Sequence, residues 1–229
     1  MNESNAWGKS AMVYSTGTAT ASIPAHRVLR NTYALLALTL TFSAAVAAAS
    51  AALKLPHPGI ILTLVGYFGL LFATYKLSNS AWGLGAVFAL TGFMGYTLGP
   101  IVNHYLAMQG GGEIVAMAFG GTALIFFGLS AWVLTSKRDF SFMGGFLFGG
   151  MIVALLAGLA AVFFQMPALS LTVSAAVVLL MSGMILFETS RIVQGGETNY
   201  ILATVSLFVS IFNLFTSLLQ LLGFLGSDE

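Results

Sequence analysis

Glu188 is the one ionisable residue that lies clearly inside an apolar stretch of this sequence, and Arg191 follows three residues later. Residues three apart share a helix face, so the two side chains can meet. An ionisable group within a membrane span is costly and marks ion pathways or proton relays. Two interpretations stay open: an interfacial ion pair that orients its helix, or a carboxylate in a cytoplasm-facing vestibule whose protonation gates or carries something.

A line of polar residues follows near the end of the chain, at Ser206, Ser210, Asn213 and Ser217. Spacings of four, three and four place these side chains on one helix face. In a helix bundle, such a face either hydrogen-bonds across to neighbouring helices or lines a narrow polar path. The residue types allow both interpretations.

Other combinations of reactive residues fail to form an enzyme site. The histidines His26, His57 and His104 fall in or near connections, and Asp139 and Asp228 lie outside the apolar stretches. The chain has no cysteine, no His-Glu-x-x-His sequence and no glycine-rich phosphate loop. We therefore expect no catalytic residues, no metal site and no cofactor.

The composition places these residues in a membrane. Of 229 residues, 58% are hydrophobic and only 7% are charged, whereas a soluble domain carries about 25% charged residues. The formal net charge of +1 offers no basic surface for nucleic acid. The lipid bilayer is the expected surrounding, and nucleic acid is not an expected partner.

Seven apolar stretches are long enough to cross a bilayer, which takes about 20 residues in a helix. Runs such as residues 175–187 do not alternate apolar with polar residues, so a barrel is excluded. The short connections make successive helices antiparallel. The sequence predicts an all-α membrane protein with seven transmembrane helices near residues 33–53, 59–76, 81–106, 113–135, 141–165, 168–190 and 200–225.

The positive charges predict the orientation of the bundle, because lysine and arginine favour the cytoplasmic side. With the N-terminus inside, seven of the eight Lys and Arg residues are cytoplasmic, and only Lys54 is outside. The C-terminus is then periplasmic. Residues 1–26, rich in Ser, Thr and Ala, are expected to form a flexible cytoplasmic arm before a transmembrane domain at 27–229.

Small residues predict where helices pack closely. Gly95 and Gly99, and again Gly145 and Gly149, form Gly-x-x-x-Gly pairs, which either pack helices within the monomer or join two copies. We expect packing within the monomer. Pro100 follows Gly99 and lacks a backbone N–H, so it is expected to kink or break the third helix, which would point to a cavity there.

Several of these segments resemble the Bax-inhibitor/YccA family. They are Gly95–Pro100, Phe187–Thr189 and Ser206–Phe215, and the similarity extends over about residues 26–226. The sequence is most similar to the branch of bacterial inner-membrane proteins that modulate the FtsH protease. A motif before the last helix fits that branch, with Glu197, Asn199 and Tyr200 as its inner-loop residues.

The resemblance implies a bundle in which the seventh helix is central and the other six surround it. It also implies a regulator in the inner membrane that binds FtsH or its membrane-bound partners, with the N-terminal arm entering the protease. The alternative is a pH-sensitive leak for Ca²⁺ or H⁺, gated by two acids in some family members. Glu188 matches the first acid, but Ser210 occupies the second position, so a two-acid latch is absent.

Overall fold

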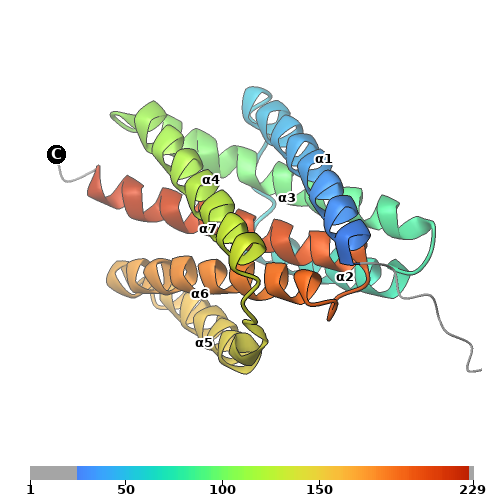
Figure 1. Ribbon diagram of the computed structural model, residues 1–229. Helices are drawn as coiled ribbons and strands as arrows, with labels where there is room; N and C mark the ends of the chain where they lie inside the picture. The colour runs from blue at the N-terminus through green and yellow to red at the C-terminus, as the bar shows by residue number, and fades with distance from the viewer. Residues whose placement is uncertain (1–24, 227–229) are drawn as a thin grey trace, which may run out of the picture.

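The computed structural model describes residues 25–226, and every predicted span is a helix in it (Figure 1). The seven helices are each long and apolar enough to cross a membrane, so this is a multi-pass membrane protein and the predicted fold class is confirmed. A short 3-10 turn, η1 (Ser141–Met143), precedes the fifth helix. The helices are α1 (Ala25–Ala52), α2 (Ile60–Leu77), α3 (Trp82–Leu106), α4 (Gly111–Ser136), α5 (Gly144–Phe163), α6 (Pro167–Val193) and α7 (Tyr200–Leu225).

The first helix begins earlier than the sequence predicts, at Ala25 instead of near residue 33. Residues 25–32 contain no glycine or proline, so nothing in them stops a helix from extending beyond the apolar stretch. The predicted arm covers residues 1–26. Residues 1–24 of it lie outside the described part of the chain, so the arm stays a prediction.

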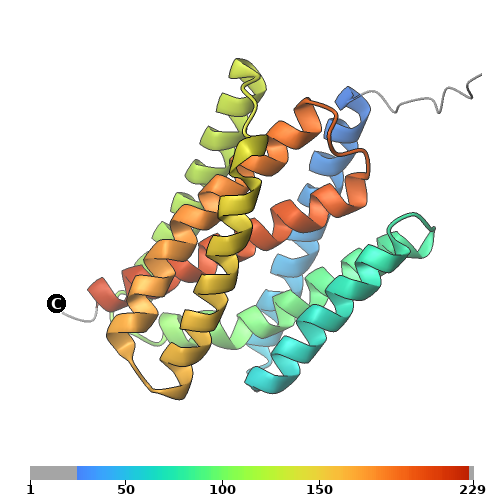
Figure 2. The same ribbon diagram turned by 90° about the horizontal axis from the view of Figure 1, so that it is seen from below.

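Helix α7 is the centre of the bundle, as predicted. It packs against α1, α3, α4 and α6, and Figure 2 shows it running between the α1–α3 group and the α4–α6 group. The other two helices are peripheral: α2 packs mainly on α3, and α5 mainly on α6. Only Thr74 is buried on α2, and only Leu147 and Ala161 on α5. The implied ring of six helices is therefore four inner helices and two outer ones.

The first glycine pair packs α3 tightly against α1, as expected for packing within the monomer. A methyl group added at Gly95 would collide with the backbone carbonyl of Ser43. One added at Gly99 would lie 2.6 Å from the side chain of Ser50. Small residues on both helices thus let the two backbones approach, which is how helices associate in lipid.

The second glycine pair does not pack within the monomer, so that part of the prediction is wrong. Nothing lies within 4 Å of a methyl group added at Gly145 or Gly149. Helix α5 instead turns Gly150 towards Leu180 of α6. The sequence offers four glycines in two adjacent pairs here, so the spacing alone does not select the face that packs.

The prediction of a kink or a break at Pro100 is wrong as to the break, because α3 is continuous through it. Proline cannot donate to the carbonyl one turn earlier, which belongs to Tyr96. The Ser50 hydroxyl on α1 donates to that carbonyl instead, at 3.0 Å. A neighbouring helix thus supplies the missing donor, as transmembrane helices with proline require. Pro100 and Asn103 line an open hollow beside the α1–α2 connection.

Candidate functional site

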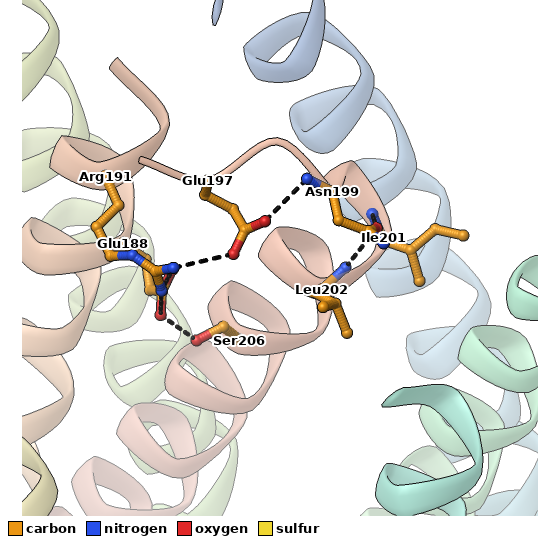
Figure 3. Close-up of polar contacts among 7 residues, drawn as sticks. All are labelled: Glu188, Arg191, Glu197, Asn199, Ile201, Leu202 and Ser206. Carbon is orange, nitrogen blue, oxygen red and sulfur yellow. Dashed lines mark hydrogen bonds and ion pairs between the residues drawn. The ribbon is translucent and has the colours of Figure 1, made fainter. Parts of the chain in front are cut away.

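Glu188 lies near the cytoplasmic end predicted for α6, buried between α6 and α7 with only 5% of its surface exposed. Arg191 Nη1 is 3.5 Å from both carboxylate oxygens of Glu188. From α7, the Ser206 hydroxyl donates to Glu188 Oε1 at 2.9 Å (Figure 3). A carboxylate removed from water needs such charged and hydrogen-bonding partners. The contacts join the two helices at the level of Glu188.

Arg191 lies between two carboxylates. Its Nη2 is 3.1 Å from Glu197 Oε2, in the α6–α7 connection, as Figure 3 shows. The Arg191 guanidinium carbon also lies 5.5 Å from the ring centroid of Phe187, which holds the side chain over an aromatic face. We call Glu188, Arg191 and Glu197 the charged triad. It combines two carboxylates with one guanidinium, so its formal charge is −1.

The residues after the triad begin α7 and attach it to a second connection. Glu197 Oε1 accepts from the Asn199 backbone N–H at 2.8 Å. The Asn199 side-chain oxygen accepts from the first backbone N–H groups of α7, those of Ile201 and Leu202 (Figure 3). This is a helix N-cap. The amide nitrogen of Asn199 donates to Asn79 Oδ1 at 3.0 Å in the α2–α3 connection.

The α4–α5 connection is tied to the same end of the bundle. The Ser190 hydroxyl accepts from the Phe140 backbone N–H at 2.9 Å and donates to the Arg138 carbonyl at 3.2 Å. Gln194 Nε2 donates to the Lys137 carbonyl at 2.9 Å. Three connections far apart in sequence, at 78–81, 137–140 and 194–199, therefore form one hydrogen-bonded surface at this end.

Asp139 caps the short turn that leads into α5. The Ser141 hydroxyl and backbone N–H both donate to its carboxylate, and these bonds hold the pKa of Asp139 below its ordinary value. The backbone bond is 2.8 Å long. The carboxylate is fully exposed, so its charge adds to the polar surface of the three joined connections.

The sequence-predicted site residues separate into two neighbouring cavities. Glu188, Arg191 and Ser210 line a cavity of about 430 Å³, whereas Asn213 lines a mainly apolar cavity of about 530 Å³. Ser210 does not bond to Glu188: its hydroxyl donates to the Ser206 carbonyl one turn earlier on α7, at 2.9 Å. The Asn213 amide similarly donates to the Val209 carbonyl, at 2.8 Å.

Two contacts of the candidate site were not predicted from the sequence. Ser206, predicted only as one of a polar line, is the α7 partner of Glu188. Glu197, predicted only as part of a motif, is the second partner of Arg191. A signal for the second contact exists: Gly195 and Gly196 lie between the two residues, and Gly195 has a φ of +75°, which turns the chain back towards α6.

The fold and site together define a class of protein: a polytopic helical membrane protein whose central last helix is joined to α6 at one end through the charged triad and Ser206. The chain matches the Bax-inhibitor family, described as inhibitor of apoptosis-promoting Bax1, over residues 25–227. It belongs to that family, which confirms the resemblance found in the sequence motifs.

Bacterial relatives cover nearly all of the chain. It is 56% identical over 217 residues to a protein of Escherichia coli K12 named modulator of FtsH protease YccA, covering 95% of this chain and 99% of that one. It is 57% identical over 202 residues to an uncharacterised protein of Pseudomonas aeruginosa, covering 88% and 91%. A membrane protein of Vibrio cholerae is 44% identical over 91% of this chain and 94% of its own length.

Proposed function

We propose that this protein is an inner-membrane regulator that binds and modulates the FtsH membrane protease, and so takes part in membrane-protein quality control. The observation that carries the proposal is the 56% identity to the E. coli modulator of FtsH protease, over 99% of that protein's length. An E. coli relative with the same coverage is named an inner membrane protein. Near-complete coverage means that the relative has no additional domain to which its named role could belong.

The three joined connections are the proposed cytoplasmic surface of the regulator. Lys76, Lys137, Arg138 and Arg191 lie at or beside this end of the bundle, whereas Lys54 lies at the other end. The positive-inside rule then makes this end cytoplasmic, with the N-terminus inside and the C-terminus periplasmic. The cytoplasmic surface would face the soluble part of a membrane-anchored protease.

We propose further that residues 1–24 form the segment through which the protease first engages the chain. A protease that pulls on this segment must next unfold a helix bundle. In that bundle α1 is bonded to α7, because the Thr204 hydroxyl donates to the Thr32 carbonyl at 3.2 Å. A slowly extracted chain occupies the protease and thereby restrains degradation of other membrane proteins.

The test compares the full chain with a variant that lacks residues 2–23, in cells that contain FtsH. The full chain should be degraded slowly by FtsH and should lengthen the half-life of another membrane substrate. The variant should be stable and without effect on that substrate. A chain that lacks residues 227–229 serves as control and should behave like the full chain. Normal turnover and inhibition by the arm-deleted variant would refute the role of the arm.

A leak for Ca²⁺ or H⁺ is the second candidate function, and one observation favours it. Glu188 of α6 and Ser210 of α7 line one cavity and Asn213 of α7 lines the next, so polar groups line two neighbouring cavities. Met151, Met181 and Val209 line both cavities and so form the boundary between them. An ion would have to pass these apolar side chains, and apolar constrictions exclude water and ions unless they open.

Flux into dye-loaded liposomes tests the leak. If it exists, flux should depend on pH and should fall in Glu188→Gln, while Glu113→Gln, which changes an exposed carboxylate at the start of α4, should leave it unchanged. Flux equal to that of empty vesicles at both mildly acidic and mildly alkaline pH, from folded protein, would reject the leak.

A further inference from the structure

A groove opens on the side of the bundle between the two outer helices. Figure 2 shows α2 and α5 on the same side of the molecule, converging at the end away from the α6–α7 connection. The two cavities lie along this groove, and both are lined by residues of α2, α5, α6 and α7. Since α2 and α5 are largely exposed, the groove faces the surrounding lipid.

The larger cavity is mainly apolar and of limited volume. Its volume is about 530 Å³, whereas a transmembrane helix of 18 residues, about 27 Å long and 10 Å across, fills about 2,000 Å³. A whole partner helix therefore exceeds the volume of this cavity, whereas a single acyl chain is a much smaller apolar group. The lining side chains are mostly aliphatic and aromatic, among them Leu64, Phe68, Phe148, Leu155 and Val162.

The smaller cavity gives the groove a charged end. The acidic and basic residues that line it are those of the charged triad, Glu188, Arg191 and Glu197. Their combined formal charge of −1 favours a cationic group. The side chain of Arg191 is 32% exposed, so an anionic group can still approach it. At 1.5 Å per residue, Glu188 lies about 8 Å from the end of α6, within reach of the headgroup region.

We propose that this groove binds one phospholipid with a primary ammonium headgroup, of the phosphatidylethanolamine type. The acyl chain lies in the apolar cavity, the ammonium group faces the carboxylates of the charged triad, and the phosphate faces Arg191. The excess carboxylate selects against an anionic lipid such as phosphatidylglycerol. This binding site is independent of the proposed action on FtsH.

Native mass spectrometry of the purified protein tests the proposal, with equal amounts of phosphatidylethanolamine and phosphatidylglycerol in the detergent. The wild type should retain one molecule of phosphatidylethanolamine in preference to phosphatidylglycerol. Gly158→Leu adds a side chain in the apolar cavity, where a Cβ makes only an ordinary 3.8 Å contact with Val173. It should lower retention of the preferred lipid about tenfold, equivalent to about 1.4 kcal/mol.

The matched control is Gly149→Leu, which makes the same change on the same helix at a position with open space around it. It should retain lipid like the wild type. Ala154→Leu, also in the apolar cavity, gives a second groove-filling variant if Gly158→Leu does not fold. Glu197→Gln brings the formal charge of the lining to zero and should reduce the preference between the two lipids.

Equal retention of the two lipids by the wild type would overturn the proposal. So would lipid retention in the folded groove-filling variants that matches the Gly149→Leu control. A dimer whose formation depends on the groove, seen as twice the protein mass, would assign the groove to a second copy and would equally overturn it.

Discussion

Arg191 contacts two carboxylates at once, and this makes it the residue on which the charged triad depends. Glu188 would still have Ser206 as a donor without Arg191, but no cation would face it within the triad. Conversely, Arg191 would still contact Glu197 if Glu188 lost its charge. The two partners of this ion pair are therefore not equivalent.

We predict that Arg191→Gln destabilises the protein more than Glu188→Gln does. Removing the shared cation leaves two neighbouring carboxylates, one of them buried, at a cost of about 2–3 kcal/mol, whereas Glu188→Gln should cost about 1 kcal/mol. Unfolding in mixed micelles measures both, with Lys76→Gln as a control on an exposed cation. The reverse order of the two costs would contradict this account of the triad.

The hydrogen bonds to Asp139 predict how its contribution to stability changes with pH. Because its pKa is lowered in the folded protein, its ionised form stabilises the fold. That contribution is complete above the ordinary carboxyl value of 3.8 and disappears as the pH falls through the lower folded value. Carboxyl chemical shifts should show a midpoint below 3.8, and Ser141→Ala should raise it; a midpoint at or above 3.8 would contradict the capping contact.

Helices α1 and α3 are held together by hydrogen bonds, one of which replaces the backbone donor that α3 lacks at Pro100. Ser50 supplies the donor that Pro100 removes from the carbonyl of Tyr96, and Gly99 gives Ser50 the space to do so. Asn103 of α3 in turn donates to the Ala51 carbonyl of α1 at 2.8 Å. The carbonyl that Pro100 leaves without a backbone donor is thus bonded by a side chain of α1.

We predict that the effects of Ser50→Ala and Pro100→Ala are coupled. In the wild type, Ser50→Ala leaves a carbonyl without its donor and should cost about 0.5–2 kcal/mol. With alanine at position 100, a backbone N–H is restored, so Ser50→Ala should cost markedly less. Unfolding free energies of the two single variants and the double variant give the coupling. Equal costs in both backgrounds would mean that Ser50 does not replace the missing donor.

The helices were predictable from sequence because each is a long apolar run between polar connections. The contacts between the helices were harder to predict from the sequence. Gly95 and Gly99 pack as predicted, but Gly145 and Gly149 face away from the bundle, since periodicity does not show which face meets a neighbour. The effect of Pro100 depended on Ser50, which is close in space but distant in sequence.

The candidate site could be predicted from the sequence only where its residues are close together in the chain. Glu188 and Arg191 are three residues apart on one helix, so their contact follows from local geometry. The contact between Glu188 and Ser206 joins two helices and depends on how α6 and α7 are rotated against each other. Ser210, the position matched to the second acid of the family, instead bonds to its own helix.

At the scale of the whole molecule, the two ends of the bundle differ. The connections that precede α3, α5 and α7 are joined by hydrogen bonds into one surface, next to the charged triad. Ser190 of α6 and Asn199 at the start of α7 take part in these bonds, so the surface is attached directly to both helices. Such an end suits contact with a large partner, and the packed bundle behind it suits resistance to extraction.

The most direct test of the proposed function is the rate at which purified FtsH degrades a membrane substrate in liposomes, with and without this protein. If the protein restrains FtsH, degradation slows as the protein is added at constant FtsH, and an unrelated seven-helix membrane protein at the same density has no such effect. A degradation rate that is the same with and without folded protein, in the same vesicles, would contradict it.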